Sequence, residues 1–183
     1  LPMAQLELAN RYLSGQGVVL DEAKGMQLLE QAAKGGSAEA QFVLAERLLA
    51  GRAVLRNEQT GLDWLRKSAH QGYLEACYRL ASLYASGQSV SRDDSQAAEW
   101  YRKAAEQGHG PSQFYLATFY LGGMGVTQDD RQALKWLREA AQRGDAAAQF
   151  NLGILYATGR GAPRDEAQAT VWYRKAAEQN LPL

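Results

Sequence analysis

The sequence has few of the residues that build catalytic and metal centres. Its 183 residues include one cysteine and two histidines. A lone cysteine excludes a disulfide within the chain, and the two histidines show no metal-ligand spacing. The motifs Ser-x-x-Lys and Gly-x-Ser-x-Gly and the phosphate-binding loop are missing too. The sequence therefore predicts no catalytic residues, no metal site and no cofactor.

Charge excess and long apolar runs are missing as well. The chain carries 20 basic and 20 acidic side chains, so its formal net charge is zero. Nucleic-acid binding depends on clustered Lys and Arg, and a membrane-spanning helix needs about 20 apolar residues. We therefore expect neither nucleic-acid binding nor membrane insertion.

What the sequence does contain is a pattern that recurs every 36 residues. Glycine occupies one register in every unit, at positions 15, 51, 87, 123 and 159. The units span residues 2–37, 38–73, 74–109, 110–145 and 146–181. A period of this length is typical of stacked repeats, in which neighbouring units share one core. The pattern predicts one domain of five helix-turn-helix units.

The third unit illustrates the expected local structure. Apolar residues at helical spacing predict a first helix over 74–86, which Gly87 ends because glycine readily adopts the left-handed conformation. Asp93 is predicted to cap the second helix, with Gln96 returning a bond to the Asp93 backbone as in a capping box. Glycine closes the second helix of four units, and in the last unit its place is taken by Asn180. The glutamines that recur early in the first helix, replaced by cysteine in the third unit, are expected to bond backbone near a helix start. They are Gln5, Gln41, Gln113 and Gln149.

These motifs resemble the Sel1-like repeat family, a relative of the tetratricopeptide repeats. The segments AAAQFNLGILY (146–156) and WYRKAAEQG (100–108) match the family pattern almost letter for letter. The resemblance implies an all-α fold, an α/α solenoid with a right-handed superhelical twist. It also implies a bacterial adaptor or scaffold. The cysteine-rich branch of the family pairs two cysteines per repeat, which this chain lacks.

In related arrays the first helix of each repeat lines a concave groove, so we expect the partner-binding residues there. An aromatic column is predicted to face the groove: Phe42, Tyr78, Phe114 and Phe150. Registers that vary between units are the candidates for specificity: Glu39, Glu75, Glu46, Ser82, Thr118, Arg79, Tyr115 and Asn151. Two alternatives stay open, namely that the aromatic column packs between repeats and that the variable positions reflect drift.

Two classes of function remain after these exclusions. The first is a non-catalytic scaffold that binds a protein or peptide of unknown identity. The second is a glycan- or peptidoglycan-fragment-binding module of the bacterial envelope, or a hydrolase. Hydrolysis would require paired carboxylates, for which Glu39, Glu46 and Glu75 are the only hint.

The two ends of the sequence carry no capping helix. The start, Leu-Pro-Met-Ala, is neither a signal peptide nor an ordinary initiator end, so cytoplasm and periplasm both stay open. Because solenoids normally end in polar units, we expect either a fragment of a longer protein or end-to-end self-association.

Overall fold

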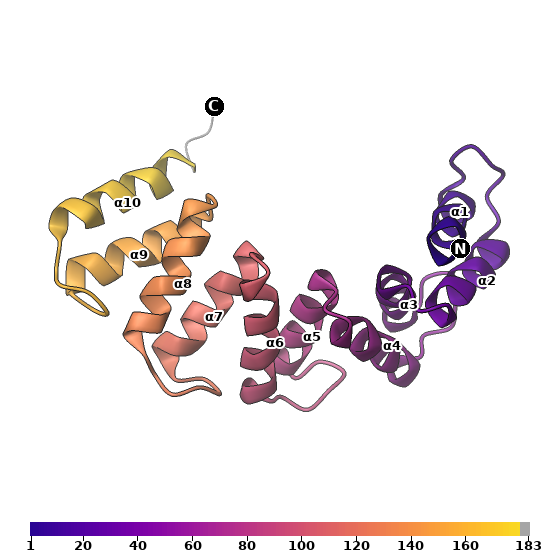
Figure 1. Cartoon of the computed structure of the whole chain (residues 1–183), viewed down its shortest axis with the longest axis horizontal. Coiled ribbons are helices and arrows are strands. Elements are labelled where there is room, and N and C mark those ends of the chain that lie inside the picture. The colour runs from indigo at the N-terminus through magenta and orange to yellow at the C-terminus, as the bar shows by residue number, and fades with distance from the viewer. Residues whose placement is uncertain (180–183) are drawn as a thin grey trace. The chain divides into compact units, whose positions relative to one another are not determined.

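The computed structural model describes residues 1–179 and contains ten helices and no strand within that range. Each helix has 13 residues, and the helices follow one another along the chain (Figure 1). Their bounds are α1 Pro2–Ser14, α2 Glu22–Lys34, α3 Ala38–Ala50, α4 Glu58–His70, α5 Leu74–Ser86, α6 Asp94–Glu106, α7 Gly110–Gly122, α8 Asp130–Gln142, α9 Ala146–Thr158 and α10 Glu166–Glu178. The predicted closing residue Asn180 and the end of the fifth unit at Leu181 lie outside the described residues.

The chain divides within α5 into two compact parts. The first part is Leu1–Leu80, and the second begins at Ala81. In the first part α1 packs on α2, α2 on α3, and α3 on α4. In the second part the contacts run in the same order from α6 to α10. Within each part, helices that follow one another in the chain therefore pack together, as expected for stacked helical pairs.

Small and large residues at fixed registers build the core. The buried leucines of the first helices, which are at most 2% exposed, are Leu44, Leu80, Leu116 and Leu152. Alanines, whose small side chains allow close helix approach, are also buried, among them Ala40, Ala45, Ala76, Ala81, Ala117 and Ala148. Fully burying one leucine is worth about 1.5–3 kcal/mol, so these columns supply much of the packing energy.

The predicted helix ends are confirmed, with one correction. Asp93 caps α6 by accepting a hydrogen bond from the backbone N–H of Gln96 at 2.9 Å. Its own backbone N–H donates to the carbonyl of Tyr84 at 3.0 Å, so it is not available to the Gln96 side chain. The predicted hydrogen bond from the Asp93 backbone N–H to the Gln96 side chain, which would complete a capping box, is therefore wrong. The same amide closes the turn in every repeat, through Asp21, Asn57, Asp129 and Asp165.

The recurring glutamines bind backbone, but not near a helix start as predicted. The side-chain amide of Gln41 donates to the carbonyl of Ala33, which lies at the end of the preceding helix, at 3.1 Å. Gln113 and Gln149 make the same bond, to Ala105 and Ala141. In the third repeat Cys77 replaces the glutamine and its buried thiol lies 3.4 Å from the carbonyl of Ala69. The column therefore ties each repeat to the one before it, since the orphan carbonyls at a helix end need partners.

A second bond completes this arrangement in two repeats and is missing in a third. The Oε1 atoms of Gln41 and Gln149 accept hydrogen bonds from glutamines 30 residues later, Gln71 and Gln179. The corresponding position after Gln113 is Arg143. The buried Oε1 of Gln113 has no hydrogen-bond partner within residues 1–179.

Restoring this bond gives a testable prediction. Arg143→Gln is expected to raise the free energy of unfolding by about 1 kcal/mol, because a buried acceptor gains its donor. Urea unfolding followed by circular dichroism measures the change. The control Arg174→Gln makes the same replacement on an exposed side chain and is expected to shift stability by less than about 0.5 kcal/mol. Equal effects of the two substitutions would contradict the prediction.

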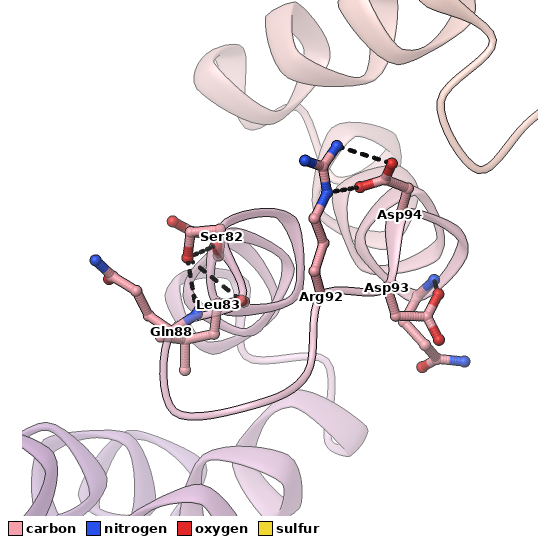
Figure 2. A network of polar contacts seen from close by, with 8 residues as sticks. Ser82, Leu83, Gln88, Arg92, Asp93 and Asp94 are labelled. Carbon is pink, nitrogen blue, oxygen red and sulfur yellow. Dashed lines mark hydrogen bonds and ion pairs between the residues drawn. The ribbon is translucent and has the colours of Figure 1, made fainter.

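Arginine side chains anchor the loops that join the two helices of a repeat by bonding to aspartates. Arg92, in the loop after α5, reaches Asp94 at the start of α6 through two hydrogen bonds of 2.9 and 3.0 Å (Figure 2). This guanidinium holds the pKa of Asp94 below its ordinary value. Arg160, in the loop after α9, instead reaches back to Asp130 in the preceding repeat at 2.6 Å. Loops are thus held both within and between repeats.

In the fourth and fifth repeats a second glycine follows two residues after the one that ends the first helix, and it lies against the backbone of the preceding repeat. A Cβ atom at Gly125 would lie 2.1 Å from the carbonyl carbon of Asp94, and one at Gly161 would lie 2.3 Å from the carbonyl oxygen of Asp130. No real Cβ atom tolerates such distances. In the second repeat this register holds Ala53, which keeps the positive φ of 60°. With an alanine at this register, the loop cannot lie as close to the start of the second helix of the preceding repeat.

Candidate functional site

The predicted aromatic column lies at the surface of the first helices. Phe150 is 53% exposed, and its ring centroid lies 5.6 Å from that of Tyr173 on the second helix of the same repeat. Phe42 is half-buried and lies 5.4 Å from Tyr73. The half-buried members that complete the column are Tyr78 and Phe114. The rings thus pack on other aromatic groups while keeping part of their surface accessible.

The three glutamates singled out in the sequence do not form one carboxylate pair. Glu46 accepts a hydrogen bond from Arg79 at 2.9 Å and forms an ion pair with it. The Tyr73 hydroxyl donates a hydrogen bond to the carboxylate of Glu75, and the negative charge of Glu39 lies nearby. Burial, followed by these two carboxylates, raises the pKa of Tyr73 to about 12. Glu39 and Glu75 therefore act on the Tyr73 phenol, whereas Glu46 pairs with Arg79.

The pKa of Tyr73 gives a pH-dependent prediction. The neutral phenol is favoured in the folded state, so its contribution to stability is complete below the ordinary pKa of 10.0 and is lost as the pH rises toward about 12. The phenolate absorbance of the wild type minus that of Tyr73→Phe should titrate with a midpoint near pH 12. A difference curve centred on the ordinary tyrosine value would refute it.

The remaining candidates are accessible, and several use part of their polarity locally. Thr118 donates to the carbonyl of Tyr115 at 2.7 Å, and Asn151 donates to that of Ala147 at 3.0 Å. The Tyr115 ring stacks on Tyr101 at 5.2 Å. The carbonyl of Ser82 accepts the Ser86 hydroxyl at 2.8 Å, within the network of Figure 2. The side chains of Thr118 and Asn151 are thus fixed in direction by their own helix, and the ring of Tyr115 by the preceding helix α6.

Three of the predicted residues meet in one pocket of the first part. Phe42, Glu46 and Arg79 line a cavity of about 420 Å³. Its other lining residues, which the sequence analysis did not select, are Val43, Arg47, Ala50 and Arg52. The register of Arg47 carried a signal for this pocket, because the same position in the later repeats holds the buried apolar residues Leu83, Phe119 and Leu155.

A second pocket lies in the last repeat. It has a volume of about 630 Å³ and contains one predicted residue, Phe150. Its other lining residues are Ala146, Ala147, Tyr173, Ala176 and Ala177. This lining is apolar and uncharged, in contrast to the pocket around Arg79. The structure therefore places four of the predicted residues in two chemically different pockets. Outside both linings are Glu39, Glu75, Tyr78, Ser82, Phe114, Tyr115, Thr118 and Asn151.

Residues 1–179 contain no group of three or more His, Cys, Asp or Glu side chains that would suit a metal ion. No helix in that range combines the length and the apolar character required to cross a membrane.

Comparison with known proteins supplies the family. The Sel1 repeat model matches five times, at residues 2–37, 38–73, 74–109, 110–145 and 146–181. These ranges coincide with the units read from the sequence. A comparison with curated protein sequences gave no match.

Solved structures agree with this assignment. A protective antigen of uropathogenic Escherichia coli strains with an SLR fold is 36% identical over 98% of this chain, with a TM-score of 0.93. The chain covers 38% of that protein, or well under half its length. A Sel1 repeat protein from Oxalobacter formigenes is 31% identical over 99% of this chain and 74% of its own, with a TM-score of 0.89. The fold is thus the all-α repeat fold of these proteins, and the chain belongs to the Sel1 repeat family.

Proposed function

We propose that this chain is a non-catalytic scaffold that binds a protein or peptide through the first helices of its repeats. Sel1 repeat proteins are generally protein-interaction scaffolds, and this coarse role is the starting point. The observation that carries the proposal is the contrast between registers. The leucine and alanine columns of the first helices are buried from the second repeat onward, whereas the aromatic column and the variable candidate positions of these helices keep accessible surface.

Accessible aromatic side chains support a protein partner. Tyr115 is 39% exposed, and Phe150 is more exposed still. Aromatic side chains are enriched at interfaces because they offer a large contact area at a low cost in conformational entropy. In this proposal the first helices line the groove that the sequence predicts, with the aromatic column as anchors and the variable polar residues as the source of specificity.

A displayed library of random peptides tests the proposal. We expect the wild type to recover peptides that a groove variant, Phe42→Ala/Tyr115→Ala/Phe150→Ala, no longer recovers. The control Val19→Ser/Leu55→Ser removes exposed apolar side chains from loops and should leave recovery intact. Circular dichroism confirms that each variant is folded.

Two outcomes would overturn the proposal. One is that no recovered peptide depends on the three groove positions. The other is that a glycan array, run in parallel, gives binding that the groove variant abolishes while no peptide is recovered. That second result would favour the envelope-glycan alternative.

A further inference from the structure

The pocket of the second repeat carries an unbalanced positive charge. Three guanidinium groups, those of Arg47, Arg52 and Arg79, line it together with a single carboxylate, that of Glu46. Glu46 is bonded to Arg79. The remaining two arginines have no ion pair or side-chain hydrogen bond within residues 1–179, whereas the chain as a whole has no net charge.

The same register in the first repeat shows what Arg47 lacks. Arg11 stands 36 residues earlier and pairs with Glu7, one helical turn before it, at 3.1 Å. One turn before Arg47 the chain has Val43, which lines the pocket as an apolar wall. Arg47 therefore lacks the acidic partner that Arg11 has, because Val43 carries no charge.

The loop of the second repeat explains why Arg52 is unpaired. In the fifth repeat Arg160 occupies this register and pairs with Asp130, which is 30 residues earlier. Gly161 permits that contact because the loop backbone lies against the start of α8. The second repeat has Ala53 in place of the glycine, and a Cβ atom at this register is incompatible with so close an approach of the loop to the preceding second helix. Arg52 therefore does not reach Glu22, although an acid is available there, and it borders the pocket instead.

We infer that this pocket binds an acidic peptide segment of a protein partner. A carboxylate of the peptide would take hydrogen bonds from Arg47 and Arg52, and an adjacent apolar side chain would lie against Phe42 and Val43. Arginine suits this role because its planar guanidinium can bond a carboxylate through two parallel N–H groups. This inference rests on the proposed function and specifies the chemistry of one of its partners.

The peptide library provides the test, with the composition of the recovered peptides as the readout. The wild type is expected to enrich Asp and Glu at least about twofold over the input library. Arg47→Gln/Arg52→Gln should lose this enrichment. A control that makes the same change in charge on exposed arginines of the second part, Arg131→Gln/Arg174→Gln, should retain it.

A synthetic peptide makes the test quantitative. The most enriched acidic peptide should bind the wild type at least about tenfold more tightly than its Glu→Gln, Asp→Asn counterpart, and added salt should weaken this binding. Equal affinities of the two peptides, or unchanged affinity in Arg47→Gln/Arg52→Gln, would overturn the inference. Recovery of groove-dependent peptides without acidic residues would overturn it while leaving the scaffold function standing, whereas recovery of no groove-dependent peptide would overturn both.

Discussion

Leu116→Ala is expected to lower the free energy of unfolding by about 2–5 kcal/mol. The side chain lies in the middle of α7 and is 0% exposed. Removing its methyl groups forfeits the transfer free energy and leaves a cavity, since α7 is held between α6 and α8 and cannot collapse freely. Chemical denaturation followed by circular dichroism measures the loss.

The repeat architecture supplies a matched control for this substitution. Leu8 occupies the register of Leu116 in the first repeat but is 38% exposed. Leu8→Ala therefore makes the same chemical change at the same point of a first helix with less burial, and we expect less than half the loss. If the two variants lost equal stability, the leucine column would not owe its effect to burial between repeats.

Gly125→Ala is expected to destabilise the protein by about 3 kcal/mol or more, for two separate reasons. The residue has a φ of 62°, which costs any L-residue with a side chain about 1 kcal/mol. In addition, the new methyl group would collide with the backbone of Asp94 and Ser95, which cannot move aside as a flexible side chain would. The loop after α7 would have to leave the start of α6.

Gly17→Ala separates the two reasons. Gly17 has the same register and a φ of 74°, but the atom nearest to its Cβ position is an Arg11 side-chain nitrogen at 3.9 Å. Only the conformational cost of about 1 kcal/mol is then expected. Equal losses for Gly17→Ala and Gly125→Ala, compared by urea unfolding, would show that close packing of the loop adds nothing.

The period of 36 residues was sufficient to predict the helices. The third unit was expected to begin with a helix over 74–86, and α5 has those bounds. Such agreement arises because apolar spacing, the glycine at the end and the cap at the start are all local signals. The right-handed sense of the superhelix stays a prediction, as does the assignment of the five units to one domain.

Contacts that join repeats were harder to predict, because they depend on backbone positions far apart in the sequence. The glutamine column was expected to bond near a helix start and instead bonds the end of the preceding helix, as Gln41 does with Ala33. The capping box failed for a related reason, since the amide of Asp93 is used by Tyr84. A sequence motif identifies a hydrogen-bond donor, but the acceptor that lies nearest to it depends on the tertiary structure.

The candidate site was predictable in outline but not in its charge. The variable registers identified Glu46 and Arg79, which do meet. Arg47 and Arg52 were missed because their significance lies in the lack of a partner. For Arg47 the sequence held the signal, since Val43 stands where the first repeat has Glu7, whereas for Arg52 it depends on the loop containing Ala53. Departures from the repeat pattern therefore carried more information about function than the pattern itself.

From the second repeat onward, a residue early in the first helix bonds the backbone carbonyl eight positions before it, and this has a genetic consequence. Gln41, Gln113 and Gln149 all make this bond, so the junctions they form are chemically alike. Excision of one whole period would rejoin a junction of the same kind, and duplication would create another. Arrays of this type can therefore change length in steps of 36 residues without a new interface having to evolve.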